Sequence, residues 1–160
     1  MMDGFPSHLA ERTRHRNSVP APHGSGPVVV WLKSSFRLHE NPAIALGRHI
    51  AAEHNRPLLI YHGIDERYPH ASLRHHTMLL DAAVDMDEGC RKAGLRYVLH
   101  VARDGHRPSV MKAFSQSASC IITDLFPLPP WTNWVDSIAA SAACPVFDVD
   151  CHCVIPMPLF

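Results

Sequence analysis

The chain has 160 residues, 46% of them hydrophobic, with 15 basic and 15 acidic side chains and a formal net charge of zero. This length and composition are those of one ordinary globular domain, and they exclude a disordered, fibrous or membrane-spanning chain. The zero net charge removes any overall basic field that would draw the protein to nucleic acid or to an anionic membrane.

The cysteines and the first 27 residues indicate the expected cellular location of the protein. Five cysteines at irregular spacing do not form a disulfide framework, so we expect reduced thiols and a cytoplasmic location. Residues 1–27 hold no continuous apolar stretch and are therefore not a signal peptide. Their prolines, glycines and charges predict a flexible leader, with a basic arm that touches nucleic acid as the alternative.

From residue 28 onward, short apolar runs alternate with helical patterns. The runs of strand length are residues 28–32, 58–61, 97–101, 120–123 and 146–149. The first four are apolar over most of their length, which is typical of parallel strands covered by helices on both faces of the sheet.

Helical patterns lie between these strands. Asn41 and Pro42 suit an N-cap and a first-turn residue, and they predict a helix that ends near residue 54. A second helix is expected over 72–93, where charged pairs mark a solvent-exposed face. A further helix is expected over 108–117.

The last helical pattern begins near residue 131, and its spacing predicts that Trp131 and Trp134 lie in the core. The complete order of elements predicts an α/β fold: an open, doubly wound, Rossmann-like sheet of five parallel strands with helices on both faces. In such sheets ligands bind beyond the carboxyl ends of the strands. The loops that follow the strands are therefore the places to search for a site.

The loop over 33–40 contains no glycine, so neither a dinucleotide-binding fingerprint nor a P-loop forms there. No serine or cysteine lies in a nucleophile motif, and we predict no catalytic residue in this chain. The histidines near residue 75 and the Cys151-His152-Cys153 segment match no zinc spacing, so we predict no metal site.

Four segments of the sequence resemble the photolyase and cryptochrome family. Residues 29–44 are similar to the family's first strand and helix, with Trp31, Arg37, Asn41 and Pro42 at matching positions. Residues 74–80 resemble the second long helix of class II photolyases. Residues 121–128 are similar to the V-T-D-F-x-P-L segment of that class, and residues 149–156 to its V-D-A-H-N-V-V-P segment.

This resemblance covers residues 28–156 and implies the family's N-terminal α/β domain, with 157–160 as the start of a linker to a helical domain. In the family the N-terminal domain often holds a light-harvesting antenna, a folate or a deazaflavin. The helical domain, absent from this chain, holds FAD and repairs DNA by light-driven electron transfer. The resemblance then implies a truncated or split form that has no photochemistry of its own and contacts DNA only indirectly. A separately encoded helical FAD domain is a candidate partner.

The sequence departs from the family where Lys33-Ser34-Ser35 replaces the usual Arg-Arg-Asp. Candidate ligand-binding residues at the carboxyl ends of the strands are Lys33, Ser35, Arg37, Asp65 and Asp124. Asp124 can equally cap or pair locally. The alternatives to a photolyase-type domain are a stand-alone module that binds a nucleotide or chromophore and a ligand-free interaction domain.

Overall fold

The computed structural model describes residues 4–20, 22, 24–68 and 70–160. Its helices are α1 (Ser7–Ala10), α2 (Pro42–Glu53), α3 (Leu73–Lys92), α4 (Val110–Ser117), α5 (Trp131–Ser141) and the short 3-10 helix η1 (Met157–Leu159). Its strands are β1 (Thr13–His15), β2 (Val28–Leu32), β3 (Leu58–Asp65), β4 (Arg96–Ala102), β5 (Cys120–Asp124) and β6 (Val146–Val149). Within the described residues, no helix is long and apolar enough to cross a membrane.

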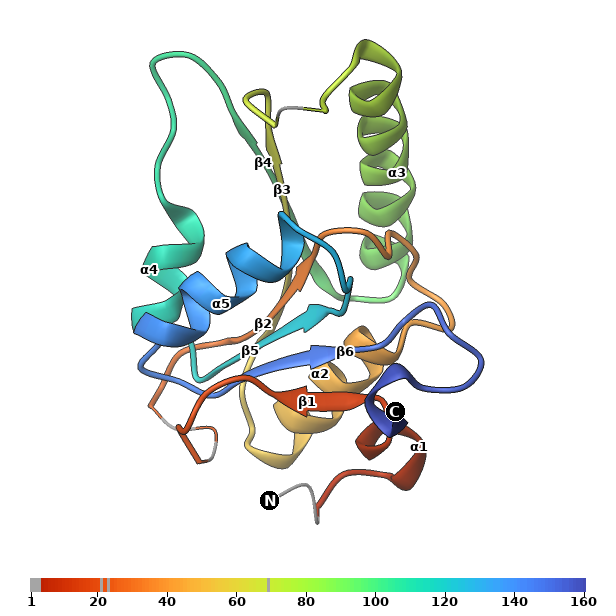
Figure 1. Cartoon of the computed structure of the whole chain (residues 1–160), viewed down its shortest axis with the longest axis vertical. Coiled ribbons are helices and arrows are strands. Elements are labelled where there is room, and N and C mark those ends of the chain that lie inside the picture. Colours follow the sequence, from red (N-terminus) through yellow and green to blue (C-terminus); the bar gives the residue numbers. More distant parts are fainter. Residues whose placement is uncertain (1–3, 21, 23, 69) are drawn as a thin grey trace.

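The sheet has six strands in the order β1-β6-β5-β2-β3-β4 (Figure 1). All neighbouring pairs from β6 to β4 are parallel, whereas β1 pairs with β6 in the antiparallel sense. The doubly wound α/β fold is therefore confirmed, and the predicted strand count is corrected from five to six.

The additional strand comes from the segment predicted to be a flexible leader, and that prediction is wrong for residues 7–15. Thr13 lies opposite Val149 in the sheet, and both Thr13 and Leu9 are buried. Backbone hydrogen bonds to the free edge of β6 hold this strand, so it needs few apolar side chains of its own. Residues on both sides of the domain boundary predicted at residue 28 therefore belong to one continuous sheet.

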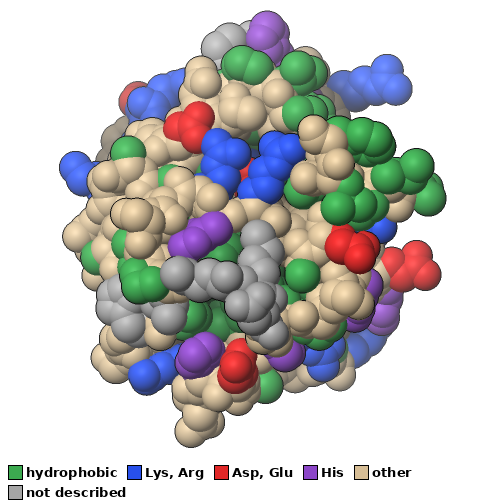
Figure 2. Space-filling view, turned by 60° about the horizontal axis from the view of Figure 1, so that its bottom comes forward, with side chains coloured by type: hydrophobic (Ala, Val, Ile, Leu, Met, Phe, Trp, Pro, Cys, Tyr) green, Lys and Arg blue, Asp and Glu red, His purple; other side chains and the backbone are tan. Residues whose placement is uncertain are grey.

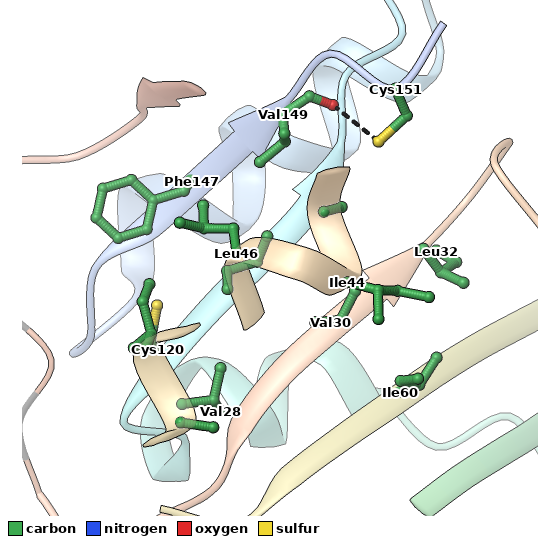
Figure 3. Close-up of a cluster of buried hydrophobic side chains, with 14 of the residues drawn as sticks. Val28, Val30, Leu32, Ile44, Leu46, Ile60, Cys120, Phe147, Val149 and Cys151 are labelled. Atoms are coloured by element: carbon green, nitrogen blue, oxygen red, sulfur yellow. Dashed lines mark hydrogen bonds between the residues drawn. The ribbon is translucent and has the colours of Figure 1, made fainter. Parts of the chain in front are cut away.

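Helices cover both faces of the sheet. Val28, Val30 and Leu32 of β2 point to one face, where they pack with side chains of α2 (Figure 3). Side chains of α1 and α3 belong to the same cluster. Val29 and Trp31 point to the other face and pack with α4 and α5. In Figure 1, α3 lies to the right of the sheet, and α4 and α5 lie to its left. Burial on both faces explains why β2 is apolar at every position.

The start of α2 agrees with the prediction. The side-chain oxygen of Asn41 accepts hydrogen bonds from the backbone N–H of Ala43 at 3.1 Å and of Ile44 at 3.2 Å, and Pro42 occupies the first turn. Gly47 lets the helix approach the sheet closely, because a Cβ there would lie 2.5 Å from a methyl carbon of Val30. The carboxyl end of β2 is thus joined to α2 by a rigidly capped turn.

Charged side chains do not gather by sign on the face seen in Figure 2, where basic, acidic and histidine side chains are interspersed with hydrophobic ones. This distribution agrees with the zero net charge of the sequence. Charge alone therefore marks no binding site on this face.

Candidate functional site

The strand order reverses between β2 and β5, which are neighbours in the sheet but lead to helices on opposite faces. The loops after these two strands therefore separate, and a crevice opens at the carboxyl edge of the sheet. This position is the usual ligand site of open α/β sheets. Four of the predicted site residues lie beside it.

Asp124, at the end of β5, binds the loop that follows β2. Its carboxylate accepts hydrogen bonds from the backbone N–H of Lys33 at 2.9 Å, of Ser34 at 2.6 Å and of Ser35 at 2.6 Å. Burial raises the pKa of Asp124, but the charge of Lys33 and these donors outweigh that effect and hold it below its ordinary value. An ionised side chain of the protein thus occupies the position where backbone N–H groups could bind an anion.

Lys33 is the cation that accompanies this carboxylate. Its side chain is only 3% exposed, and its Nζ lies 3.2 Å from Asp124 Oδ1 and 2.6 Å from the Asp124 carbonyl oxygen. The same ammonium group lies 5.1 Å from the centre of the Trp31 ring. Lys33 and Asp124 therefore form a buried ion pair at the point where the strand order reverses.

Ser35 and Arg37 extend this network to the loop after β6. Arg37 donates through Nη1 to Ser35 Oγ at 2.8 Å and through Nη2 to the carbonyl oxygen of Cys151 at 2.5 Å. Cys151 is buried, and its thiol faces the Val149 carbonyl oxygen (Figure 3). Of the predicted site residues, Lys33, Ser35, Arg37 and Asp124 thus come together in a network that joins three loops. Their binding of a ligand stays a prediction.

A cavity of about 960 Å³ lies beside this network. The register pairs Leu32 of β2 with His62 of β3, so β3 continues to Asp65 beyond the end of β2. β4 follows β3 as far as Ala102. These projecting strand ends, together with residues at the amino-terminal ends of α3, α4 and α5, enclose the cavity.

Aromatic rings form much of the cavity wall. The lining includes Trp31, Phe36, Tyr61, Tyr68, Trp131 and Trp134. The Tyr68 ring centre lies 5.7 Å from that of Trp131 and 6.1 Å from that of Trp134. The prediction that both tryptophans lie in the core is wrong, since Trp131 is half-buried and Trp134 is 40% exposed. They stand in the first turn of α5, at the cavity, whereas Val135 and Ala139 reach the core.

Two histidines on the cavity lining, His62 and His100, were not among the predicted site residues. His62 bonds through Nδ1 to Tyr97 Oη at 3.0 Å, and His100 bonds through Nδ1 to Tyr61 Oη at 3.1 Å. The Nε2 atom of each imidazole is buried and has no hydrogen-bond partner among the described residues. The sequence marks these two histidines only by their place, because each one interrupts a strand that is otherwise largely apolar.

Asp65 lies at the end of β3, on the lining of the cavity and away from the network of Asp124. It accepts a hydrogen bond from Arg67 Nε at 2.9 Å, and this contact lowers the pKa of Asp65 to about 2. Arg107 lines the cavity as well and pairs with Glu66 and Asp104. The charged side chains here are thus held in ion pairs.

A group of three or more His, Cys, Asp or Glu side chains able to hold a metal is not found within the described parts of the chain. In the Cys151–Cys153 segment, His152 Nε2 lies 3.0 Å from Ser34 Oγ, and the carboxylate of Asp150 accepts the backbone N–H of His152 and Cys153. This segment is therefore a turn organised by Asp150.

An open, doubly wound sheet with helices on both faces places the chain in the class of α/β proteins with a Rossmann-like fold. The family is shown by the sequence. The DNA photolyase family model matches residues 28–158, and the chain belongs to that family as its N-terminal photolyase-like domain.

Two curated relatives are similar to the chain. The deoxyribodipyrimidine photo-lyase of Methanothermobacter thermautotrophicus is 29% identical over 148 residues, which are 92% of this chain and 33% of the relative. The deoxyribodipyrimidine photo-lyase of Potorous tridactylus is 26% identical over 132 residues, which are 80% of this chain and 24% of the relative. The chain thus spans a third or less of these relatives. The resemblance to class II in particular stays a prediction.

Solved structures resemble the chain only loosely. A universal stress protein in complex with cAMP has a TM-score of 0.46 and 14% identity, covering 81% of this chain and 100% of that chain. A universal stress protein from Archaeoglobus fulgidus has a TM-score of 0.42 and 15% identity, covering 76% of this chain and 43% of that chain. Superposition this loose carries no information on ligands.

Proposed function

We propose that this chain is the antenna-binding domain of a photolyase-like protein and holds a folate or a deazaflavin in the cavity at the carboxyl edge of β2, β3 and β4. The observation that carries the proposal is the cavity itself, whose volume of about 960 Å³ suits a ligand of this size. Membership of the photolyase family supports the choice of ligand class.

The cavity wall suits a flat heteroaromatic ring. Trp131 and Trp134 have their ring centres 6.0 Å apart, and Tyr68 lies beside both of them. Exposed aromatic rings at a cavity offer surfaces on which planar ligands stack. Lys33 and Asp65 lie on the same lining, so this proposal gives two of the predicted residues a place near the ligand.

Repair chemistry in this proposal belongs to a helical FAD domain, in the rest of the same protein or in a separately encoded partner. The 160 residues then carry out no photochemistry of their own, and they contact DNA only through that domain. The match to the chain covers 33% and 24% of the lengths of the two curated relatives. All five cysteines are free thiols, which supports a cytoplasmic location.

Chromophore binding is tested on the purified full chain with 8-hydroxy-5-deazariboflavin and with 5,10-methenyltetrahydrofolate. Binding should shift the absorption of the chromophore and quench the tryptophan fluorescence. Trp134→Ala should weaken binding about tenfold, because loss of one stacking ring costs about 1–3 kcal/mol.

The matched control is Phe160→Ala, since Phe160 is an aromatic residue that is 92% exposed and lies away from the cavity lining. This variant should bind like the wild type. A wild-type chain that binds neither chromophore contradicts the proposal. Binding of AMP or ATP in place of both would favour the stand-alone nucleotide module.

A further inference from the structure

The strand β4 forms an open edge of the sheet. It is seven residues long and stands last in the strand order, with β3 as its neighbour. Among the described residues, the backbone of 96–102 forms no hydrogen bond besides those of its ladder with β3. The outward N–H and C=O groups of such a strand are a template for pairing with another strand.

The sequence of β4 lacks the features that usually protect a sheet edge. Protected edges are short, or they carry prolines and several charged side chains. The opposite edge of this sheet is protected by its length, because β1 has only three residues. In β4 there is no proline, and Arg96, its first residue, is its only Lys, Arg, Asp or Glu. The edge of β4 is therefore open to association.

Apolar side chains flank this edge on both faces of the sheet. Val98 lies opposite Tyr61 in the register, so it points to the face that α4 and α5 cover. Val101 points to the other face, together with Tyr97, because successive side chains of a strand alternate. Both valines are exposed. A strand paired with β4 would cover them.

The helix α3 lies beside β4 and presents a second apolar surface (Figure 1). Leu73, Leu80 and Val84 are all exposed, and at 3.6 residues per turn they share one side of the helix. Gly89 lies on the opposite side, where a Cβ would be 3.1 Å from a methyl carbon of Leu38. Leu38 follows β2 and lies towards the middle of the sheet, so the apolar side of α3 faces towards the free edge of β4.

We propose that two copies of this chain associate through β4 and the apolar side of α3, with the two β4 strands paired in the antiparallel sense. A twofold axis makes one surface patch meet its own copy. Antiparallel pairing then satisfies the outward backbone groups of both edges and places the two α3 helices on the same face of a continuous sheet. Burial of the exposed apolar side chains supplies the driving force.

The charges at the two ends of β4 favour a second copy as the partner. Arg96 begins the strand, and Asp104 follows its end by two residues. In an antiparallel pair centred on His100, Arg96 of each copy lies opposite Asp104 of the other, and opposite charges in such pairs are stabilising. Asp104 is exposed and available for this contact, since Arg107, its partner within the chain, also pairs with Glu66.

Analytical ultracentrifugation of the full chain, with a reducing agent present to keep the cysteines from linking two copies, measures the association. At about 100 µM the wild type should sediment as a dimer with twice the chain mass of 17.8 kDa, and it should dissociate on dilution. Val101→Lys and Val84→Lys place a charge on the β4 edge and on α3, and each should weaken dimerisation at least about tenfold. The matched control is Ile155→Lys, at an exposed apolar residue of the C-terminal segment, which should dimerise like the wild type. Circular dichroism verifies that each variant is folded.

Charge reversal tests the direction of pairing. Arg96→Asp and Asp104→Arg should each weaken the dimer, because like charges then face each other, and the double variant should restore the affinity to within about threefold of the wild type. Absence of this rescue overturns the antiparallel pairing centred on His100. A wild type that stays monomeric at about 100 µM, or a dimer that Val101→Lys and Val84→Lys leave intact, overturns the proposal as a whole.

Discussion

Asp124 is the side chain on which the loops at the carboxyl edge of the sheet depend. It pairs with the buried ammonium group of Lys33 and accepts three backbone N–H groups from the loop after β2. Asp124→Asn removes the negative charge and leaves Lys33 buried without a counter-ion. We expect a loss of about 3–5 kcal/mol in the free energy of unfolding, measured by urea denaturation.

The control for this substitution is Asp136→Asn, since Asp136 also pairs with a basic residue, Arg16, but is 60% exposed. Exposed pairs contribute about 0–1 kcal/mol, so this variant should unfold nearly like the wild type. Equal losses in the two variants would show that the buried ion pair with Lys33 has no special role in stability.

Burial of the His62 imidazole should make the stability of the protein depend on pH. In the folded protein the pKa of His62 is about 4, below its ordinary value of 6.5. Between these two values the unfolded chain binds a proton that the folded chain does not, so stability falls as the pH drops from 6.5 towards 4. His62→Asn lacks this loss. The free energy of unfolding of His62→Asn, compared with that of the wild type, should rise by about 3 kcal/mol as the pH is lowered from 7 to 4.

Urea denaturation of the wild type and of His62→Asn across this pH range measures the difference directly. Nuclear magnetic resonance of the imidazole provides a second measurement, because the signal of His62 should titrate near pH 4. Parallel stability curves for the two proteins would contradict the burial of a neutral His62.

At the scale of elements, the segment with α1 and β1 holds the C-terminal segment in place. Arg12 donates to the carbonyl oxygens of Cys153 at 2.7 Å and Val154 at 3.1 Å, and its own carbonyl oxygen accepts the N–H of Asp150. Arg12→Ala should lower stability by about 2 kcal/mol, because hydrogen bonds from charged donors contribute about 1.5–3 kcal/mol. Amide hydrogen exchange should accelerate over residues 150–157.

The matched control is Arg91→Ala. Arg91 pairs with Asp87 on the outer face of α3, and its side chain is 72% exposed. This change should leave both stability and exchange close to those of the wild type. Unchanged exchange over 150–157 in Arg12→Ala would mean that η1 and the turn before it do not need the N-terminal segment.

At the scale of the whole molecule, β1 and β6 come from opposite ends of the chain and lie side by side at one edge of the sheet. β6 lies between β5 and β1, and it brings Phe147 and Val149 into the core. A chain that stops after residue 143 should therefore show no cooperative unfolding transition in circular dichroism. A chain that stops after residue 156 lacks only η1 and Phe160 and should keep a cooperative transition. Cooperative folding of the shorter chain would show that the sheet is stable without β6.

Much of the fold could be predicted because burial leaves a strong mark on the sequence. Strands covered on both faces are apolar runs, and Asn41 with Pro42 marks the start of α2 through local hydrogen bonding. β1 was not predicted because it is only three residues long and is held by backbone hydrogen bonds to β6. Backbone pairing at a sheet edge requires no particular side chains.

The candidate site was less predictable for a physical reason. Helical spacing shows that Trp131 and Trp134 share a side of α5, but it does not show where the sheet beneath that side ends. Here both rings stand in the first turns of α5 and line a cavity. His62 and His100 were overlooked because a histidine within a strand carries no sign of whether both its nitrogens find partners.

The sequence by itself determined the family and the doubly wound order of helices and strands, and it predicted the carboxyl edge of the sheet as the place of the candidate site, because these follow from local pattern and matching motifs. Only the tertiary structure decided that Asp124 and Lys33 satisfy each other, that residues 13–15 add a strand to the sheet, and that the tryptophans of α5 line a cavity. These features depend on contacts between residues far apart in the chain, such as Lys33 with Asp124 and Thr13 with Val149.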